Sequence, residues 1–237
     1  MAFDTGLDPV HYRGVASMGA RQALATLLGV AVVAALIAAY VVFLTGGPTP
    51  YSVPVSAADK RSVSLTLQTV AAVGPELSPN ANWVSYLVNE HGTWRRSTVW
   101  TLPAHTLVHV TVYQFDGRSG LRNPFLAQAR GIVGGSFTVD GKTMKVIDPA
   151  DASHTFAIPQ LGVIVPLEGV ADDAKNQCED APCALSTAHT TITFTFRTGK
   201  KGHYRWQCFV PCAAGFLYGF GGPMQTIGYM DGFIDVV

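Results

Sequence analysis

Two cysteines near the C-terminal end of the chain, Cys208 and Cys212, are the residues best suited to chemistry. Thiolate sulfur is a soft ligand, and together with imidazole nitrogen it suits copper. A histidine in another segment, His154, is followed at alternate positions by Phe156 and Ile158. We therefore expect His154 to reach a metal site from a different strand than the two sulfurs.

The residues that lead into Cys208 follow the two-residue period of a β-strand. Tyr204, Trp206 and Cys208 fall on one face of that strand. The aromatic pair predicts that this face is inward, because large rings bury extensive apolar surface. The first sulfur should therefore be buried at the end of a strand.

The other two cysteines, Cys178 and Cys183, lie in a polar, turn-rich segment without a histidine. Four cysteines allow three pairings, and the sequence alone does not choose among them. Because no imidazole is close, a local disulfide that closes a small loop is the favoured interpretation for this pair. A small ring stabilises a fold less than a large one.

Charge and composition indicate a membrane-associated protein rather than a nucleic-acid binder. Sixteen basic and sixteen acidic residues cancel, which leaves no basic excess for a phosphate backbone. Only 14% of the residues are charged and 48% are hydrophobic, whereas soluble proteins carry about 25% charged residues. A chain of 237 residues has room for one anchor and one domain with a proper core.

An uncharged stretch from Gln22 to Ala58 contains an almost continuous apolar run from Ala23 to Leu44. As a helix this run covers about 33 Å, enough to cross a bilayer once. A cleaved signal peptide is the alternative, but its apolar region is usually only about 7 to 15 residues long. Arg13 and Arg21 precede the run, and the next basic residue is Lys60.

This distribution of basic residues keeps the N-terminus in the cytoplasm, by the positive-inside rule. We expect a cytoplasmic tail over residues 1–21, a transmembrane helix over 22–45, a linker over 46–61 and an extracytoplasmic domain over 62–237. The chain would then be a single-pass protein of the cell membrane. Disulfides persist on the outer side of that membrane.

Beyond the anchor, the patterns predict strands and no long amphipathic helix. Apolar residues alternate with polar ones in three stretches, which we expect to be half-buried strands: Val63, Leu65 and Leu67; Val108, Val110 and Val112; Ile192, Phe194 and Phe196. Asp-Gly pairs at 116–117, 140–141 and 231–232 are signals for tight turns. The prediction is an all-β sandwich in which segments 117–149 and 215–228 are insertions or elaborated loops.

Residues 151–159 and 202–212 together resemble the two segments that carry most of the dinuclear copper site in the cupredoxin domain of cytochrome c oxidase subunit II. This resemblance implies an all-β, cupredoxin-like Greek-key β-sandwich with one N-terminal transmembrane helix. It assigns the bridging thiolates to Cys208 and Cys212, the first imidazole to His154, and a backbone carbonyl near the metal to Val210.

The family's remaining two ligands have no direct counterpart here. The second imidazole falls on Phe216 and the thioether on Gly219, and neither side chain can bind a metal. Met230, ahead of a final strand, restores the thioether, with Met224 as the second choice. No histidine follows His203, so the expected metal ligands are an incomplete set: His154, Cys208, Cys212 and Met230.

The resemblance implies a membrane-anchored subunit or accessory of a respiratory, oxidase-type complex, with copper binding and electron transfer, and with oxidase subunits or a redox donor as partners. Two alternatives stay open. In one, the chain is a metal-free interaction module with a Cys208–Cys212 disulfide; in the other, it delivers copper from its incomplete site. The sequence contains no hydrolase signature, and we do not expect the chain to be an enzyme by itself.

Overall fold

The computed structural model describes residues 19–45, 53–54, 62–212 and 222–237. The chain divides into two units, residues 1–47 and 48–237. The first contains one helix, α1 (Ala20–Thr45), which is built from Ala, Leu and Val and contains no proline. Its apolar part, Ala20–Val42, has a mean hydropathy of 2.5 and is long enough to cross a membrane.

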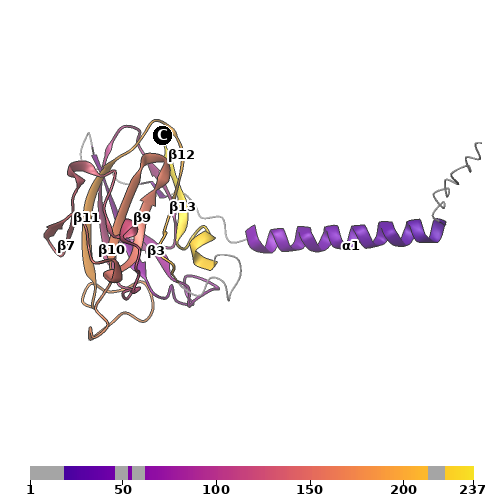
Figure 1. Cartoon of the computed structure of the whole chain (residues 1–237), viewed down its shortest axis with the longest axis horizontal. Helices are drawn as coiled ribbons and strands as arrows, with labels where there is room; N and C mark the ends of the chain where they lie inside the picture. Colours follow the sequence, from indigo (N-terminus) through magenta and orange to yellow (C-terminus); the bar gives the residue numbers. More distant parts are fainter. Residues whose placement is uncertain (1–18, 46–52, 55–61, 213–221) are drawn as a thin grey trace, which may run out of the picture. The chain divides into compact units, whose positions relative to one another are not determined.

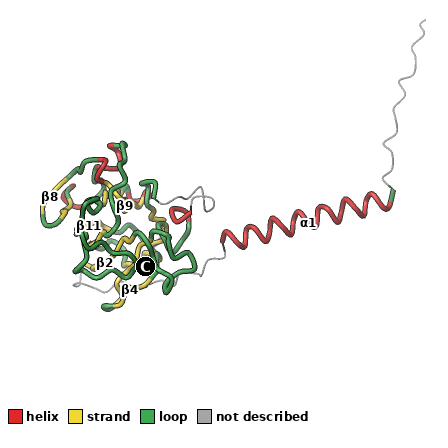
Figure 2. The backbone as a smooth tube through the Cα atoms, turned by 90° about the horizontal axis from the view of Figure 1, so that it is seen from below, coloured by secondary structure: helices red, strands yellow, loops and turns green. Residues whose placement is uncertain are grey.

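The second unit consists mainly of strands (Figure 1). Among the described residues α1 is the only long helix, because the other helices are single 3₁₀ turns (Figure 2). The strands are β1 (Val53–Pro54), β2 (Ser62–Val70), β3 (Ser85–Glu90), β4 (Thr93–Arg95), β5 (Val99–Leu102), β6 (Leu107–Gln114), β7 (Phe137–Val139), β8 (Lys142–Met144), β9 (Ala152–Ile158), β10 (Val163–Glu168), β11 (Thr190–Arg197), β12 (Gly202–Gln207) and β13 (Asp231–Val236). The 3₁₀ turns are η1 (Pro124–Ala127), η2 (Val133–Gly135), η3 (Pro149–Asp151), η4 (Pro159–Leu161) and η5 (Gly222–Gln225).

These strands form two sheets. One has the order β1-β5-β13-β12-β9-β10, and the other has the order β4-β3-β2-β6-β11-β7-β8. Strands distant in sequence become neighbours: β2 runs parallel to β6, and β5 runs parallel to β13. The predicted all-β sandwich class with one N-terminal apolar helix is therefore confirmed.

The core lies between the two sheets. Phe156 on β9 packs against Phe194 and Phe196 on β11, with ring centroids 5.3 and 5.9 Å apart. Trp206 on β12 stacks on Trp100 of β5 at 4.6 Å, and both rings are fully buried. Burying a large apolar side chain contributes roughly 1.5 to 3 kcal/mol, so the buried contacts of Trp206 fix the position of β12 and of the cysteine that follows it.

The three alternating stretches form strands as predicted, β2, β6 and β11, and their apolar residues are buried. The turn signals are only partly correct. Asp140 and Gly141 both have positive φ and connect β7 to β8, but Asp231 and Gly232 begin strand β13 instead. Gly232 is needed for close packing, since a Cβ there would lie 1.8 Å from the carbonyl oxygen of Thr98.

Segment 117–149 is more than a loop. It contains β7 and β8, which extend the second sheet through the pairing of β7 with β11. Phe137 on β7 is buried in the main core. Of the other predicted insertion, 215–228, residues 215–221 lie outside the described part of the chain, and the rest includes η5.

Candidate metal centre

His154 and Cys208 come together because β9 and β12 are neighbours in the first sheet. The two strands pair at Ala157 and Gln207, one residue before Cys208. The backbone N–H of Cys208 donates to the carbonyl of Met230 at 3.0 Å, which ties the end of β12 to the start of β13. Every residue of β9 is buried, so the imidazole of His154 lies inside the protein.

Three metal-binding side chains meet at this point: His154, Cys208 and Cys212. Their ligand atoms all lie within 4.8 Å of one another. The Sγ atom of Cys208 is 3.8 Å from Nδ1 of His154 and 3.7 Å from Sγ of Cys212. All three residues are buried, with relative exposures of 1%, 0% and 6%.

Cys208 and Cys212 are free thiols. The alternative with a disulfide between them is wrong for this structure, because a disulfide needs its sulfurs about 2.05 Å apart, whereas these are 3.7 Å apart.

The two distances from the sulfur of Cys208 to the other donor atoms fit a single metal ion. Bonds of about 2.0 to 2.3 Å to imidazole nitrogen and thiolate sulfur place the donors of a trigonal or tetrahedral site roughly 3.5 to 4 Å apart. The two distances from Cys208, 3.7 and 3.8 Å, fall in this interval. Two sulfurs and one nitrogen form a soft donor set, which suits copper, Cu(I) in particular.

The backbone around Cys208 orients its sulfur. The N–H of Thr155 points to Cys208 Sγ at 3.5 Å, and the hydroxyl of Thr155 accepts a hydrogen bond from the N–H of Phe209 at 2.8 Å. The carbonyl of Val210, which the resemblance placed near the metal, lies 3.5 Å from the same sulfur. Thr155 therefore fixes the cysteine and the loop after it, a role that the sequence pattern did not reveal.

Asp116 is the second residue that sequence reasoning missed. Its Oδ2 lies 3.0 Å from Nε2 of His154, on the side of the ring away from the sulfur. The Asp-Gly pair at 116–117 had the pattern of a turn, and nothing in the sequence connects it to a histidine 38 residues later. The contact between Asp116 and His154 depends on how β6 and β9 are arranged in their two sheets.

The electrostatics of the centre separate the two thiols. Burial alone would raise the pKa of Cys208, but hydrogen bonds from Cys212 and His154 and the positive imidazolium bring it well below its ordinary value. The hydrogen bond to Cys208, together with burial, raises the pKa of Cys212. Of the two thiols, Cys208 is therefore the one that ionises more readily, and Cys212 donates a hydrogen bond to it.

His154 is the partner of Cys208. Burial alone would lower the pKa of the ring, but hydrogen bonds to Asp116 and Cys208 raise it to about 9. The same bond to His154 lowers the pKa of Asp116, although burial opposes it. These shifts favour a thiolate at Cys208, an imidazolium at His154 and a carboxylate at Asp116.

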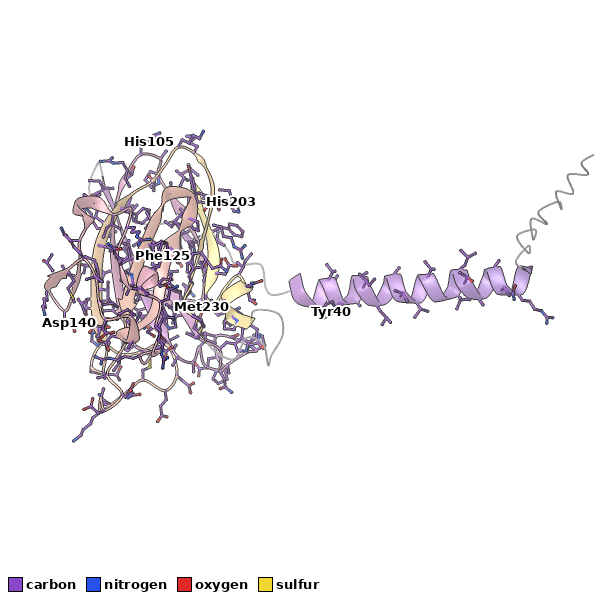
Figure 3. All side chains as sticks on the ribbon, viewed as in Figure 1. Tyr40, His105, Phe125, Asp140, His203 and Met230 are labelled. Carbon is purple, nitrogen blue, oxygen red and sulfur yellow. A yellow bond between two sulfur atoms is a disulfide. The ribbon has the colours of Figure 1, made fainter. Side chains whose placement is uncertain are left out.

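The two candidate thioethers lie on either side of residues 225–229. Met230 is fully buried inside the sandwich (Figure 3). Met224 is partly exposed, and its Sδ lies 3.4 Å from the backbone nitrogen of Cys212. The positions of the family's second imidazole and thioether, Phe216 and Gly219, lie outside the described residues.

The other cysteine pair, Cys178 and Cys183, forms a disulfide, as predicted. Cys183 belongs to a smaller core cluster than the one that contains Cys208 and Cys212. The side chain of Gln68 holds it there, by accepting from the N–H of Cys183 at 3.0 Å and donating to its carbonyl at 2.7 Å.

No protein-family model and no curated protein matches the chain. Among solved structures, it is similar to the copper protein rusticyanin, with 18% identity over 76% of this chain and 80% of that chain and a TM-score of 0.31. Rusticyanin from Thiobacillus ferrooxidans gives 20% identity, coverages of 76% and 79%, and a TM-score of 0.30. A chain of a heme-copper terminal oxidase dimer gives 12% identity, coverages of 92% and 99%, and a TM-score of 0.33. Such distant likenesses concern the fold at most, and the chemistry of the site rests on its own geometry.

Proposed function

We propose that the chain is a membrane-anchored, cupredoxin-like subunit or accessory of a respiratory, oxidase-type complex and that it binds copper at His154, Cys208 and Cys212. The observation that carries this proposal is the meeting of three buried donor atoms within 4.8 Å. Bound copper would supply reversible one-electron chemistry between Cu(I) and Cu(II). The protein would supply a rigid sheet that holds the ligands in place.

A thioether from Met230 or Met224 completes the proposed ligand set. Met230 matches the family's closing methionine, whereas Met224 places its sulfur beside Cys212. Single substitutions to leucine decide between them, because leucine keeps most of the volume and removes the sulfur. The variant that loses copper affinity identifies the ligand, and unchanged affinity in both variants leaves a three-donor site.

Copper titration of the full chain in detergent tests the proposal. Under reducing conditions we expect one Cu(I) per chain in competition with a chromophoric chelator. The matched control is the double variant Cys178→Ser/Cys183→Ser, which removes two sulfurs that lie in the other core cluster. Absence of binding in the wild type would overturn the copper site and favour the metal-free interaction module.

The membrane and the respiratory partner are parts of the same proposal. The apolar helix α1 is long enough to anchor the chain, and Arg21 lies at its beginning, which supports a cytoplasmic N-terminus. Isolation of the chain from detergent-solubilised membranes, followed by haem spectroscopy and identification of the bound proteins, tests the partner. Recovery of the chain without any haem protein would contradict an oxidase assembly.

Copper delivery is the second candidate, and the partial exposure of Met224 at the edge of the centre favours it. A carrier must release its ion, whereas an electron-transfer site must keep it through both oxidation states. Transfer of Cu(I) to a soluble acceptor within seconds would support delivery. Repeated oxidation and reduction without loss of copper would support electron transfer.

A further inference from the structure

Asp116 occupies an unusual place for an acidic residue. It follows strand β6 and begins the long segment that carries β7 and β8. Its Oδ2 lies 3.0 Å from Nε2 of the buried His154, and its Oδ1 accepts a hydrogen bond from the N–H of Gly117 at 2.8 Å. Each carboxylate oxygen therefore has a defined partner, although the side chain is 28% exposed.

The backbone of Asp116 is also held in place. Its carbonyl accepts from the N–H of Val170 at 2.9 Å. The next residue packs directly against Gly169, where a Cβ would lie 2.7 Å from the carbonyl carbon of Gly117. On the same segment Arg118 forms an ion pair with Asp151 at 2.8 Å. The carboxylate is thus part of a fixed frame rather than a freely rotating surface group.

The imidazole of His154 has two nitrogens with different neighbours. Nδ1 faces the sulfur of Cys208 at 3.8 Å, and Nε2 faces Asp116. A neutral ring carries one proton, and the hydrogen bond at one nitrogen decides which nitrogen keeps it. With the proton on Nε2 and donated to Asp116, the lone pair of Nδ1 points toward the sulfurs.

We propose that Asp116 is the positioning residue of the copper site: it holds His154 in the tautomer and orientation that direct Nδ1 to the metal. This inference rests on the proposed function and deepens it, because it gives a role in the centre to Asp116, which directly precedes the inserted segment 117–149. A carboxylate on the far nitrogen makes a ligand histidine a stronger donor, and removing such a partner typically weakens metal affinity by about 10- to 100-fold.

The negative charge of Asp116 has a second consequence. A nearby anion favours the more highly charged metal ion, so the carboxylate stabilises Cu(II) relative to Cu(I). Removal of the charge should raise the reduction potential of bound copper. The potential therefore reports the charge of Asp116, whereas the ring signals of His154 report the tautomer that Asp116 holds.

The experiment compares the full-length wild type in detergent with Asp116→Ala, Asp116→Asn and Asp151→Ala. Asp151→Ala is the matched control, because it removes the same charge from a side chain of similar exposure that pairs with Arg118 instead of His154. The probe is copper itself. Cu(I) affinity, reduction potential, and the ¹⁵N signals of the His154 ring in the Cu(I) form are measured for each.

We expect Asp116→Ala to weaken Cu(I) binding by about 10- to 100-fold, to raise the potential and to alter the ring signals. Asp116→Asn keeps an oxygen that accepts from Nε2–H, so it should retain the wild-type tautomer and most of the affinity while the potential still rises. This variant also provides the test if Asp116→Ala does not fold. Asp151→Ala should stay within about twofold of the wild type, below the range for a lost partner.

Two results would overturn the inference, and they are distinguishable. If the wild type binds copper and both Asp116 variants match it in affinity, potential and ring signals, Asp116 does not position the ligand and the proposed function stands. If the wild type binds no copper, the proposed function fails and the inference fails with it.

Discussion

The two cysteine pairs of this chain have nearly the same spacing but opposite chemistry. Cys178 and Cys183, five residues apart, form a disulfide, whereas Cys208 and Cys212, four apart, stay free. The first pair lies in a loop that can bring its Cα atoms to 5.8 Å. The second begins at the end of a strand, where the N–H of Thr155 points to the sulfur of Cys208 at 3.5 Å.

The difference shows that the neighbours of a thiol, rather than its distance along the chain from another thiol, determine its state. Cys208 has an imidazole, a second thiol and a backbone N–H around its sulfur, all of which favour the thiolate. The sulfur of Cys178 is bonded to that of Cys183 and lies 3.3 Å from the carbonyl oxygen of Asp180. One environment offers donor atoms for a cation, and the other closes a loop.

The largest expected effect comes from exchanging sulfur for oxygen in one pair at a time. Cys208→Ser should reduce Cu(I) affinity at least about 1,000-fold, ~4 kcal/mol, because a hard, protonated hydroxyl is a poor ligand for a soft ion. Cys178→Ser/Cys183→Ser should leave the affinity unchanged. Competition titration of both full-length variants measures this, and equal losses would show that the two pairs do not differ as proposed.

The second largest expected effect is a pH dependence of stability that comes from the His154–Cys208–Cys212 cluster and not from the Cys178–Cys183 disulfide. The pKa of His154, about 9 in the folded chain, exceeds the ordinary histidine value of about 6.5. The contribution of His154, up to about 3 kcal/mol, is therefore complete below about pH 6.5 and is lost as the pH rises through about 9. The lowered pKa of Cys208 contributes in the opposite direction up to the ordinary thiol value of about 8.5. The two contributions offset each other between about pH 6.5 and 8.5, so the net stability should fall only above about pH 8.5. The raised pKa of Cys212 acts in the same direction as that of His154, because this thiol would ionise more readily once unfolded.

Urea unfolding of the metal-free, full-length chain checks this prediction. All four tryptophans follow the anchor, so their fluorescence reports on the β-domain. The free energy of unfolding should stay nearly constant between about pH 6.5 and 8.5 and fall above about pH 8.5 in the wild type and in Cys178→Ser/Cys183→Ser. The fall should be less steep in His154→Gln. A wild-type value that already falls between about pH 6.5 and 8.5 would contradict the imidazolium–thiolate pair.

The disulfide itself should contribute a smaller amount of stability. Closing a loop with a sequence separation of five residues removes chain entropy from the unfolded state worth about 2 kcal/mol. Cys178→Ser/Cys183→Ser should lower the urea midpoint accordingly, with no change in copper affinity. Mild reduction of the wild type should reproduce this loss. A drop in copper affinity on reduction would instead link the two regions.

Local sequence patterns predicted the surroundings of the cysteines in part, but not their contacts with residues distant in the sequence. The alternation through Trp206 predicted a buried Cys208 at the end of a strand, and the lack of a histidine near Cys178 predicted the disulfide of that pair. Whether Cys208 and Cys212 are bonded to each other stayed open from the sequence. The positions of Asp116 and Thr155 were not predictable, because their contacts depend on which strands become neighbours. A two-residue period shows that β6 and β9 are strands, but not which residue beyond them meets His154.

The smallest expected effect concerns a second histidine–carboxylate pair, His203 with Asp235 on the outer face of β12 and β13. His203 lies at the surface (Figure 3) and is 58% exposed, whereas His154 is 1% exposed. Solvent screens an exposed pair, so Asp235→Asn should change the free energy of unfolding by less than about 1 kcal/mol. Copper affinity should not change. Urea unfolding measures the stability and chelator competition measures the copper affinity, each in parallel with Asp116→Asn. If Asp235→Asn lost as much stability or affinity as Asp116→Asn, burial would not be what distinguishes the two histidine–carboxylate pairs.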